Sequence, residues 1–142
     1  TGQVKSLSEI EDEVFSSGML GDGIAIEPTS GQVVSPVDGT VSSVFPTKHA
    51  IGITSDEGVE ILIHIGMDTV SLNGDGFENF VQQNDRVTKG MLIARVDLDK
   101  LKAAGFSTIT PVVITNTSDY KKVKTVANHE VKEGDLILTI EH

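Results

Sequence analysis

The sequence predicts an all-β fold, a sandwich or a barrel of antiparallel strands, from three observations. Short runs rich in valine, isoleucine and threonine recur at roughly the 8–12-residue spacing of such folds. Fourteen glycines and four prolines are spread along the chain and separate these runs. Only one stretch, residues 98–104, has the features of a helix. With 142 residues the chain is long enough for one domain with a real core, which valine, isoleucine and leucine must build because tryptophan is absent.

In the first half of the chain, turn signals separate the expected strands. Glycine and aspartate mark turns at residues 21–23, 37–40 and 55–58, and an acidic loop is expected at residues 11–18. The strands expected between them are residues 2–10, 24–28, 32–36, 40–45, 50–54 and 59–65.

The second half contains the expected helix. Asp97 is a typical N-cap residue for residues 98–104, and Gly105 is a typical stop. Pro111 interrupts the run at residues 108–115, which predicts a strand at a sheet edge because proline donates no backbone hydrogen bond. A loop is expected at residues 72–76, and the other expected strands are residues 77–81, 91–97 and 136–140.

One internal repetition is visible in the second half. Residues 87–97 and 131–141 share a pattern: valine, a turn with glycine at the fourth position, then an apolar strand. Two related hairpins would give the sheet approximate internal symmetry, although any turn followed by a strand produces a similar pattern.

The composition excludes several classes of function. The net charge of −10 argues against nucleic acid and anionic membranes as partners and favours a protein with a basic docking face. Without cysteine there is no disulfide, thiol nucleophile or thiolate metal site. No signal peptide or membrane-spanning run is present, so we expect a cytoplasmic location without direct membrane insertion. The first residue is not methionine, which leaves open a domain cut from a longer protein.

The chemistry of the chain centres on residues 58–70. Alternation predicts a strand with Val59, Ile61, Ile63 and Ile65 on one face and His64 on the other, and Gly66 ends that strand. A histidine at that point lies at a sheet rim. Taken alone, it is more often a buried histidine bonded to a carbonyl than a reacting group.

A second histidine changes this interpretation. His49 precedes the neighbouring strand and His64 nearly ends its own, so antiparallel pairing across the 55–58 turn brings the two rings together. Thr47 and Asp68 flank them in the sequence, and the apolar side chains close by are Phe45, Leu62 and Val70.

Two facing imidazoles allow three interpretations. They bind a metal, with Asp68 as a third ligand; or one attacks phosphorus while the other donates to the phosphoryl oxygens; or they are purely structural. The residues alone rank the structural interpretation first and leave the other two nearly equal. No P-loop pattern is present, so a donor protein would have to supply the phosphate.

At these residues the chain resembles a known family, the glucose-type IIA component of the bacterial phosphoenolpyruvate-dependent sugar phosphotransferase system. The resemblance covers almost the whole length, and several motifs occur in the right order. They are Val14-Phe15 with Gly21-Asp-Gly-Ile-Ala-Ile26, Pro36-Val-Asp-Gly-Thr40, Thr47-Lys-His-Ala50, Gly58-Val-Glu60 with His64-Ile-Gly-Met-Asp-Thr-Val70, and Thr110-Pro-Val-Val-Ile-Thr-Asn116.

The resemblance implies a single phosphocarrier domain over residues 1–142. Its fold would be an antiparallel β-sandwich (a barrel-sandwich hybrid) with one or two short helices. His64 would accept a phosphoryl group from the carrier HPr and pass it to a cysteine of a IIB domain during sugar uptake, as a phosphotransferase without a cofactor. His49 would hydrogen-bond the phosphoryl group, and Thr47 would orient His49.

The resemblance also implies a docking surface. Asp12 and Asp68 would meet arginines of HPr at its edge, and Asp68 is interpreted as a docking or gating charge rather than a general base. The implied partners are HPr, a IIB domain, and regulated transporters or kinases, and tethering to the membrane would come through a fused or partner permease. The apolar residues that would line the surface are Val14, Phe15, Leu20, Phe45, Leu62 and Val70.

Two other classes of function stay open. The first is a zinc hydrolase on a similar scaffold, although the phosphocarrier role requires no metal and would leave His49 and His64 only as adventitious or partner-shared zinc ligands. The second is a non-catalytic regulatory domain that is phosphorylated without onward transfer. Tightly bound zinc would indicate the former, and failure to transfer to any IIB domain the latter.

Overall fold

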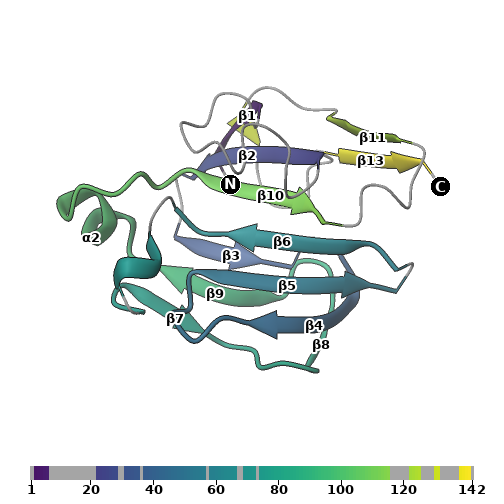
Figure 1. Ribbon diagram of the computed structural model, residues 1–142, viewed down its shortest axis with the longest axis horizontal. Helices are drawn as coiled ribbons and strands as arrows, with labels where there is room; N and C mark the ends of the chain where they lie inside the picture. The colour runs from purple at the N-terminus through teal and green to yellow at the C-terminus, as the bar shows by residue number, and fades with distance from the viewer. Residues whose placement is uncertain are drawn as a thin grey trace.

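Three antiparallel sheets make up most of the structure, a computed structural model (Figure 1). Among the residues that the structure describes, one sheet has eight strands, one has three and one has two. The structure describes residues 2–6, 22–28, 31–35, 37–56, 58–66, 69–72, 74–115, 122–125, 130–131 and 138–141.

The eight-stranded sheet contains most of the strands expected from the sequence, paired in the order β12-β1-β2-β10-β6-β5-β4-β8. Strands β4, β5 and β6 follow one another in the chain and pair in that order, while β10 joins β6 to β2. The bounds are Glu130–Val131 for β12, Gly2–Ser6 for β1, Asp22–Pro28 for β2, Thr110–Ile114 for β10, Glu60–His64 for β6, Ala50–Ser55 for β5, Gly39–Val44 for β4 and Arg86–Val87 for β8.

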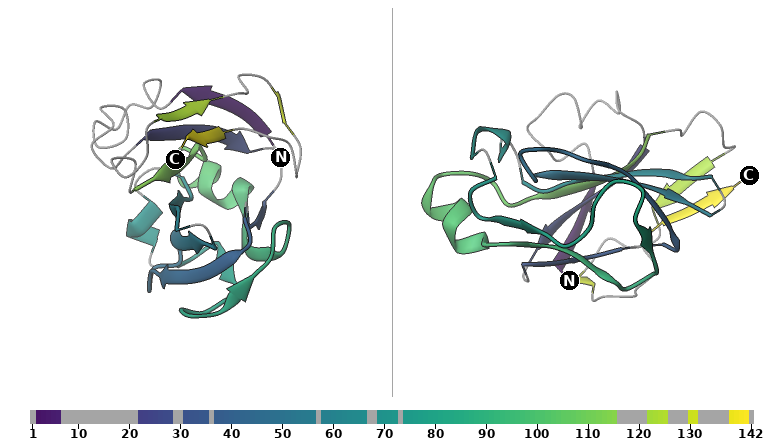
Figure 2. Two further views of the ribbon diagram at one scale, coloured as in Figure 1. Left: turned by 90° about the vertical axis from the view of Figure 1, so that its right-hand side faces the viewer. Right: turned by 90° about the horizontal axis from the view of Figure 1, so that it is seen from below.

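The smaller sheets complete the sandwich. The sheet β3-β9-β7 forms a second layer against the strands β4 to β6, as the turned views of Figure 2 show. Beside the strands there are a 3₁₀ helix, η2 (Thr69–Leu72), and one α-helix, α2 (Leu98–Ala103), among the described residues. The remaining strands are β3 (Gln32–Val34), β9 (Leu92–Val96), β7 (Phe77–Asn79), β11 (Lys122–Thr125) and β13 (Leu138–Glu141).

The core lies between these two layers. The alternation predicted for residues 59–65 is confirmed, because Ile61 and Ile63 are no more than 6 % exposed while Leu62 and His64 on the opposite face are half-buried. Ile51 of β5 and Ile93 of β9 are fully buried in the same cluster. The predicted antiparallel all-β fold is therefore confirmed, and valine and isoleucine build its core.

The predicted helix is present. Asp97 caps α2, since its carboxylate accepts a hydrogen bond of 3.0 Å from the Lys100 amide, and Gly105 follows with a φ of 86°. Leu101 is fully buried and anchors the helix to the core. Helix α2 and η2 lie at the same end of the molecule, where β6 ends and β5 begins (Figure 1).

The position predicted for Pro111 is wrong. Strand β10 is not at an edge but lies between β2 and β6, and Pro111 is fully buried opposite Ala25. Pairing of β10 with β6 begins only at Val112. Pro111 therefore lies just outside the β10–β6 ladder, so its missing N–H removes no hydrogen bond from that ladder.

The two repeated segments also differ from the prediction. They are not hairpins, because β8 pairs with β4 while β9 pairs with β3 and β7, and β12 pairs with β1 while β13 pairs with β11. Yet β8 and β12 form the two edges of the eight-stranded sheet, and the strands that follow them, β9 and β13, belong to the two smaller sheets. The repetition therefore corresponds to equivalent places in the topology.

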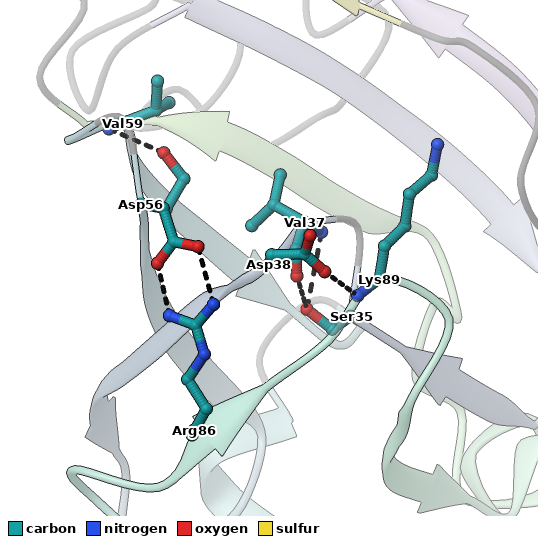
Figure 3. Close-up of polar contacts among 8 residues, drawn as sticks. Ser35, Val37, Asp38, Asp56, Val59, Arg86 and Lys89 are labelled. Carbon is teal, nitrogen blue, oxygen red and sulfur yellow. Dashed lines mark hydrogen bonds and ion pairs between the residues drawn. The ribbon is translucent and has the colours of Figure 1, made fainter.

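Polar contacts hold the end of the sheet away from α2 (Figure 3). The guanidinium of Arg86 donates two hydrogen bonds to the carboxylate of Asp56, one of them 2.6 Å long. The carboxylate of Asp38 accepts from the Lys89 amide at 2.8 Å. These contacts join the β5–β6 turn and the entry to β4 with the segment around β8. They are exposed, so they fix local geometry more than they stabilise the fold.

Candidate functional site: a histidine pair at one rim of the sheet

The hairpin β5–β6 places the two histidines side by side. Ala50 pairs with His64, and the carbonyl of His49 accepts a 2.7 Å hydrogen bond from the Ile65 amide. The ring centroids of His49 and His64 lie 4.9 Å apart, with the ring planes at 78°. The rings thus meet at one rim, as the spacing on consecutive strands predicts.

A tight connection between β4 and β5 holds His49. The Lys48 amide donates to the Phe45 carbonyl at 2.8 Å, and Lys48 has a φ of 63°. The Phe45 amide then donates to the Ala50 carbonyl at 3.2 Å, which closes the loop. His49 is consequently only 5 % exposed, and the rings of Phe45 and His49 pack edge to face with centroids 5.5 Å apart.

Thr47 contacts the ring of His49. Its hydroxyl Oγ1 lies 2.5 Å from Nδ1 of His49, so the two form a hydrogen bond. A hydroxyl can donate or accept, and this bond therefore orients the ring in either tautomer. The pKa of His49 is lowered, first by burial and then by the charge that His64 carries when protonated. His49 is accordingly held neutral to lower pH than an exposed histidine.

The backbone just after β6 sets the tautomer of His64. Nδ1 of His64 lies 2.7 Å from the Gly66 carbonyl oxygen. A carbonyl can only accept, so Nδ1 carries the proton in the neutral ring and Nε2 carries the lone pair. The sequence identifies Gly66 only as a strand breaker and misses this role of its carbonyl. The one available signal was a glycine two residues after a histidine at a strand end.

A hollow in the outer face of β4, β5 and β6 lies beside the pair. Gly52 stands opposite Leu62, and a bulge in β4 after Val41 brings two serines to it. A Cβ on Gly52 would lie 2.6 Å from Oγ of Ser43 and 2.9 Å from Oγ of Ser42, so a larger residue there would have to displace the two serine side chains. The residues that line the hollow are Ser42, Ser43, Phe45, Gly52, Thr54, Glu60, Ile61, Leu62 and Thr115.

The structure covers part of the docking surface that the sequence suggests. Phe45 is 40 % exposed and Leu62 is half-buried, and both line the hollow. The backbone of Val70 belongs to η2. The other residues expected at the site lie outside the described residues: Asp12, Val14, Phe15, Leu20 and Asp68.

The sequence also bears on metal binding and on membrane insertion. Within the described parts of the chain, no three histidine, cysteine or acidic side chains gather closely enough to hold a metal ion. Asp68, the third ligand considered from the sequence, is not among those residues. Over the same ranges, no helix has the length and apolar character needed to cross a bilayer.

Fold and site together define a β-sandwich domain that presents two adjacent imidazoles at one rim. A family model described as phosphoenolpyruvate-dependent sugar phosphotransferase system, EIIA 1, matches residues 1–120. The chain therefore belongs to this family. Among solved structures, glucose permease IIA from Mycoplasma capricolum has the same fold, with a TM-score of 0.90 and 47% identity over 96% of this chain and 88% of that chain.

Curated relatives match the chain at sequence identities close to that of the solved structure. The beta-glucoside-specific EIIBCA component of Bacillus subtilis (strain 168) is 52% identical over 140 residues, which cover 97% of this chain and 23% of the relative. The glucose-specific EIICBA component of Staphylococcus saprophyticus is 56% identical over 118 residues, 83% of this chain and 17% of the relative. The chain thus spans roughly a fifth of the length of the curated relatives it matches.

Proposed function

We propose that this chain is the phosphocarrier domain of a sugar phosphotransferase system, with His64 as the phosphoryl acceptor. The donor would be phospho-HPr and the acceptor a cysteine of a IIB domain. The observation that carries the assignment is the 2.7 Å contact between Nδ1 of His64 and the Gly66 carbonyl, with the ring of His49 4.9 Å away. That arrangement leaves the lone pair of a neutral imidazole on Nε2, as a nucleophile requires.

The transfer balances without a cofactor. The Nε2 lone pair of His64 attacks phosphorus, a new N–P bond forms, and the N–P bond to the histidine of HPr breaks, with the electron pair returning to that ring. In the second step a thiolate of the IIB domain attacks, an S–P bond forms, and the electron pair of the broken N–P bond returns to Nε2. The proton on Nδ1 stays in place throughout, so Gly66 holds it through both steps.

His49 supplies charge stabilisation in this scheme. Phosphoryl transfer depends mainly on positioning and on groups that meet the charge on the phosphoryl oxygens. If the Thr47 hydroxyl donates to Nδ1 of His49, Nε2 of His49 carries a proton and can donate it in a hydrogen bond to those oxygens. Burial keeps the ring in one position, which lowers the reorganisation needed when the phosphoryl group arrives.

The docking surface would take both protein partners in turn. Phe45 and Leu62 supply apolar contacts, and the hollow that they line, which also contains serine and threonine side chains, supplies a concave face on the hairpin that carries the histidine pair. By motif, Val14, Phe15, Leu20 and Val70 extend it, and Asp12 and Asp68 meet basic residues of HPr. The net charge of −10 suits such partners. Asp68 serves docking rather than base catalysis in this scheme, since a carboxylate beside a phosphoryl dianion needs a neutralising arginine.

The names of the relatives suggest which other components this domain works with. Their names combine IIA with other components of one permease, in the orders EIIBCA and EIICBA. We place this domain in, or beside, such a permease, which would hold it at the membrane. The relatives differ in the sugar that their names give, so we assign sugar choice to the other components.

Intact mass spectrometry tests the acceptor. The chain is incubated with phosphoenolpyruvate, enzyme I and HPr, with wild type and His64→Ala side by side. We expect an acid-labile gain of one phosphoryl group in wild type only. A wild-type chain that gains nothing contradicts the phosphocarrier function, and metal analysis of the purified chain would follow. A gain in both proteins places the phosphoryl group on another residue.

The same assay with His49→Gln tests the division of roles. Glutamine keeps a hydrogen-bond donor but cannot carry the charge of an imidazolium. The variant should accept phosphate from HPr yet pass it slowly to a IIB domain, measured by the mass gain of that domain over time. A His49→Gln chain that cannot be phosphorylated at all would show that His49 is needed for acceptance.

A further inference from the structure

We propose that Thr69 is a positioning residue for His64. This role rests on the phosphocarrier function proposed above. The Thr69 hydroxyl holds the Ile65 carbonyl and thereby the turn at Gly66. The Gly66 carbonyl in turn sets the tautomer of His64, the reacting ring. Thr69 does not touch the reacting atoms in this scheme. It acts through two backbone groups that lie between it and His64.

The first link is a buried hydrogen bond. Oγ1 of Thr69 donates to the Ile65 carbonyl at 2.5 Å, and Thr69 and Ile65 are no more than 1 % exposed. A buried carbonyl that lost this donor would have no water to replace it, so the bond is costly to break. The Ile65 amide is held as well, since it donates to the His49 carbonyl at 2.7 Å. The backbone entering Gly66 is therefore restrained on both sides of Ile65.

The second link is the steric fit around Gly66. Its φ of 76° is a conformation that glycine adopts without strain. A Cβ there would lie 2.6 Å from Cγ2 of Thr69 and 2.9 Å from the carbonyl oxygen of Ser107. Leu101 of α2 approaches the same point at 3.4 Å. Thr69 thus contacts the turn through its methyl group as well as its hydroxyl, and helix α2 supports the turn from behind.

The third link is the tautomer. An imidazole without restraint favours the proton on Nε2, the nitrogen that must attack phosphorus. The Gly66 carbonyl reverses that preference by accepting from Nδ1 at 2.7 Å. If the Ile65 carbonyl is released, the peptide plane can turn to find another donor, and the flexible Gly66 turns with it. The bond to Nδ1 then weakens, and a larger share of the rings carry the proton on Nε2.

Nitrogen NMR of the unphosphorylated chain tests the proposal directly. Labelled histidine gives the ratio of the two tautomers of neutral His64 from its ring nitrogen shifts. In Thr69→Val, which keeps the shape but loses the hydroxyl, the ratio should move toward the Nε2-protonated form by about tenfold, the worth of roughly one hydrogen bond. Phosphoryl uptake from phospho-HPr should slow in the same variant. Thr69→Ser retains the hydroxyl and should keep the wild-type ratio.

A second threonine serves as the matched control. Thr110 of β10 is also buried and donates to a backbone carbonyl, that of Thr108, at 3.1 Å. Thr110→Val should lower the melting temperature and leave the tautomer ratio of His64 unchanged. The proposal is overturned if Thr69→Val folds and keeps the wild-type ratio, or if Thr110→Val shifts the ratio as strongly.

The readouts separate this proposal from the phosphocarrier function. The tautomer ratio is measured without any phosphoryl donor. A shifted ratio in Thr69→Val therefore supports the link from Thr69 to His64 even if the wild-type chain accepts no phosphate, a result that would overturn the phosphocarrier function alone. An unshifted ratio in a chain that is phosphorylated normally overturns the role of Thr69 alone.

Discussion

The two histidines differ in what faces Nδ1 of each ring. Nδ1 of His64 meets a carbonyl, which only accepts, whereas Nδ1 of His49 meets the Thr47 hydroxyl, which donates or accepts. The tautomer of His64 is therefore fixed, while His49 can change its protonation without losing its hydrogen bond. This asymmetry suits the proposed roles, in which His64 always attacks through the same nitrogen and His49 responds to a changing charge.

The lowered pKa of His49 predicts a pH dependence of stability. Its folded pKa lies below its unfolded value of about 6.5, so the unfolded chain binds more protons as the pH falls below that value. Stability from this residue is therefore fully present above about pH 6.5 and is lost as the pH falls toward the folded pKa. His49→Gln removes that loss. The melting temperature of the variant minus that of wild type should increase as the pH is lowered from about 8 to about 5.

A difference in melting temperature between the two proteins that stays constant over that pH range would contradict this prediction. They would mean that His49 titrates alike in the folded and unfolded chains. Differential scanning calorimetry at matched ionic strength is the suitable measurement, since titrating groups that do not interact with His49 contribute equally to both proteins.

Strands β4 and β5 approach each other without room for a side chain at Gly39. A Cβ there would overlap the carbonyl of Thr54 and lie 2.9 Å from Cα of Ser55. Both contacts are with backbone, which cannot move aside without separating the strands. Because β5 carries His49 into place, this close approach also supports the site at the other end of the hairpin.

Gly39→Ala is therefore expected to destabilise the fold by about 3 kcal/mol, the upper part of the usual range for overpacking. Gly90→Ala is the comparison, because Gly90 has open space around it and only a positive φ of 88°. That change should cost about 1 kcal/mol through backbone strain alone. Urea denaturation gives both values. Equal costs for the two variants would show that backbone strain, not the strand contact, decides the effect.

The sequence predicts this architecture well where its signals are local. Alternation from Val59 to Ile65 identifies the strand that carries His64, and Asp97 with Gly105 brackets the helix. The sequence-based prediction fails at Pro111. Proline lacks a backbone N–H donor, but the sequence does not show toward which neighbouring strand that donor would have pointed. The sequence analysis also misses η2 and β11, since each has only four residues, too few for a periodic pattern to be recognised.

The candidate site is predictable to a similar extent. Histidines fifteen residues apart on consecutive strands predict a meeting of the rings, and the structure shows it. The tautomer of His64 is not predictable in this way, because it depends on the direction of one carbonyl. The Thr69 contact is likewise hidden, since a threonine four residues beyond a strand end has many possible uses.

At the scale of the whole molecule, each of the two repeated segments begins at one edge of the eight-stranded sheet. Strands β8 and β12 are two residues each as described, and each is followed by a strand in a smaller sheet. Short edge strands limit unwanted pairing with other chains. The repetition in the sequence thus coincides with equivalent places at opposite edges of the sheet.

The net charge of −10 predicts a salt dependence of the proposed phosphoryl relay. Attraction between an acidic chain and a basic docking face raises the association rate at low salt. Between low and high salt, kcat/KM for phospho-HPr should fall roughly tenfold, since screening shortens the Debye length from about 30 Å at 0.01 M to about 3 Å at 1 M. A small phosphoryl donor such as phosphoramidate, tested on the same chain, should show a much weaker dependence. A flat response with phospho-HPr would rule out steering by charge.

The hairpin β5–β6 lies inside the eight-stranded sheet, and neither of its strands is an edge. Native proteins open from their least supported segments inward. Thermal fraying at β8 or β12 therefore leaves the imidazoles in register, and the pair separates only when interior ladders break. Amide hydrogens of Ile51 and Ile63, which stand opposite each other in that hairpin, should exchange among the slowest in the protein. Under the proposed function, the edge strands can open repeatedly between transfers while the histidine pair stays intact for the next partner.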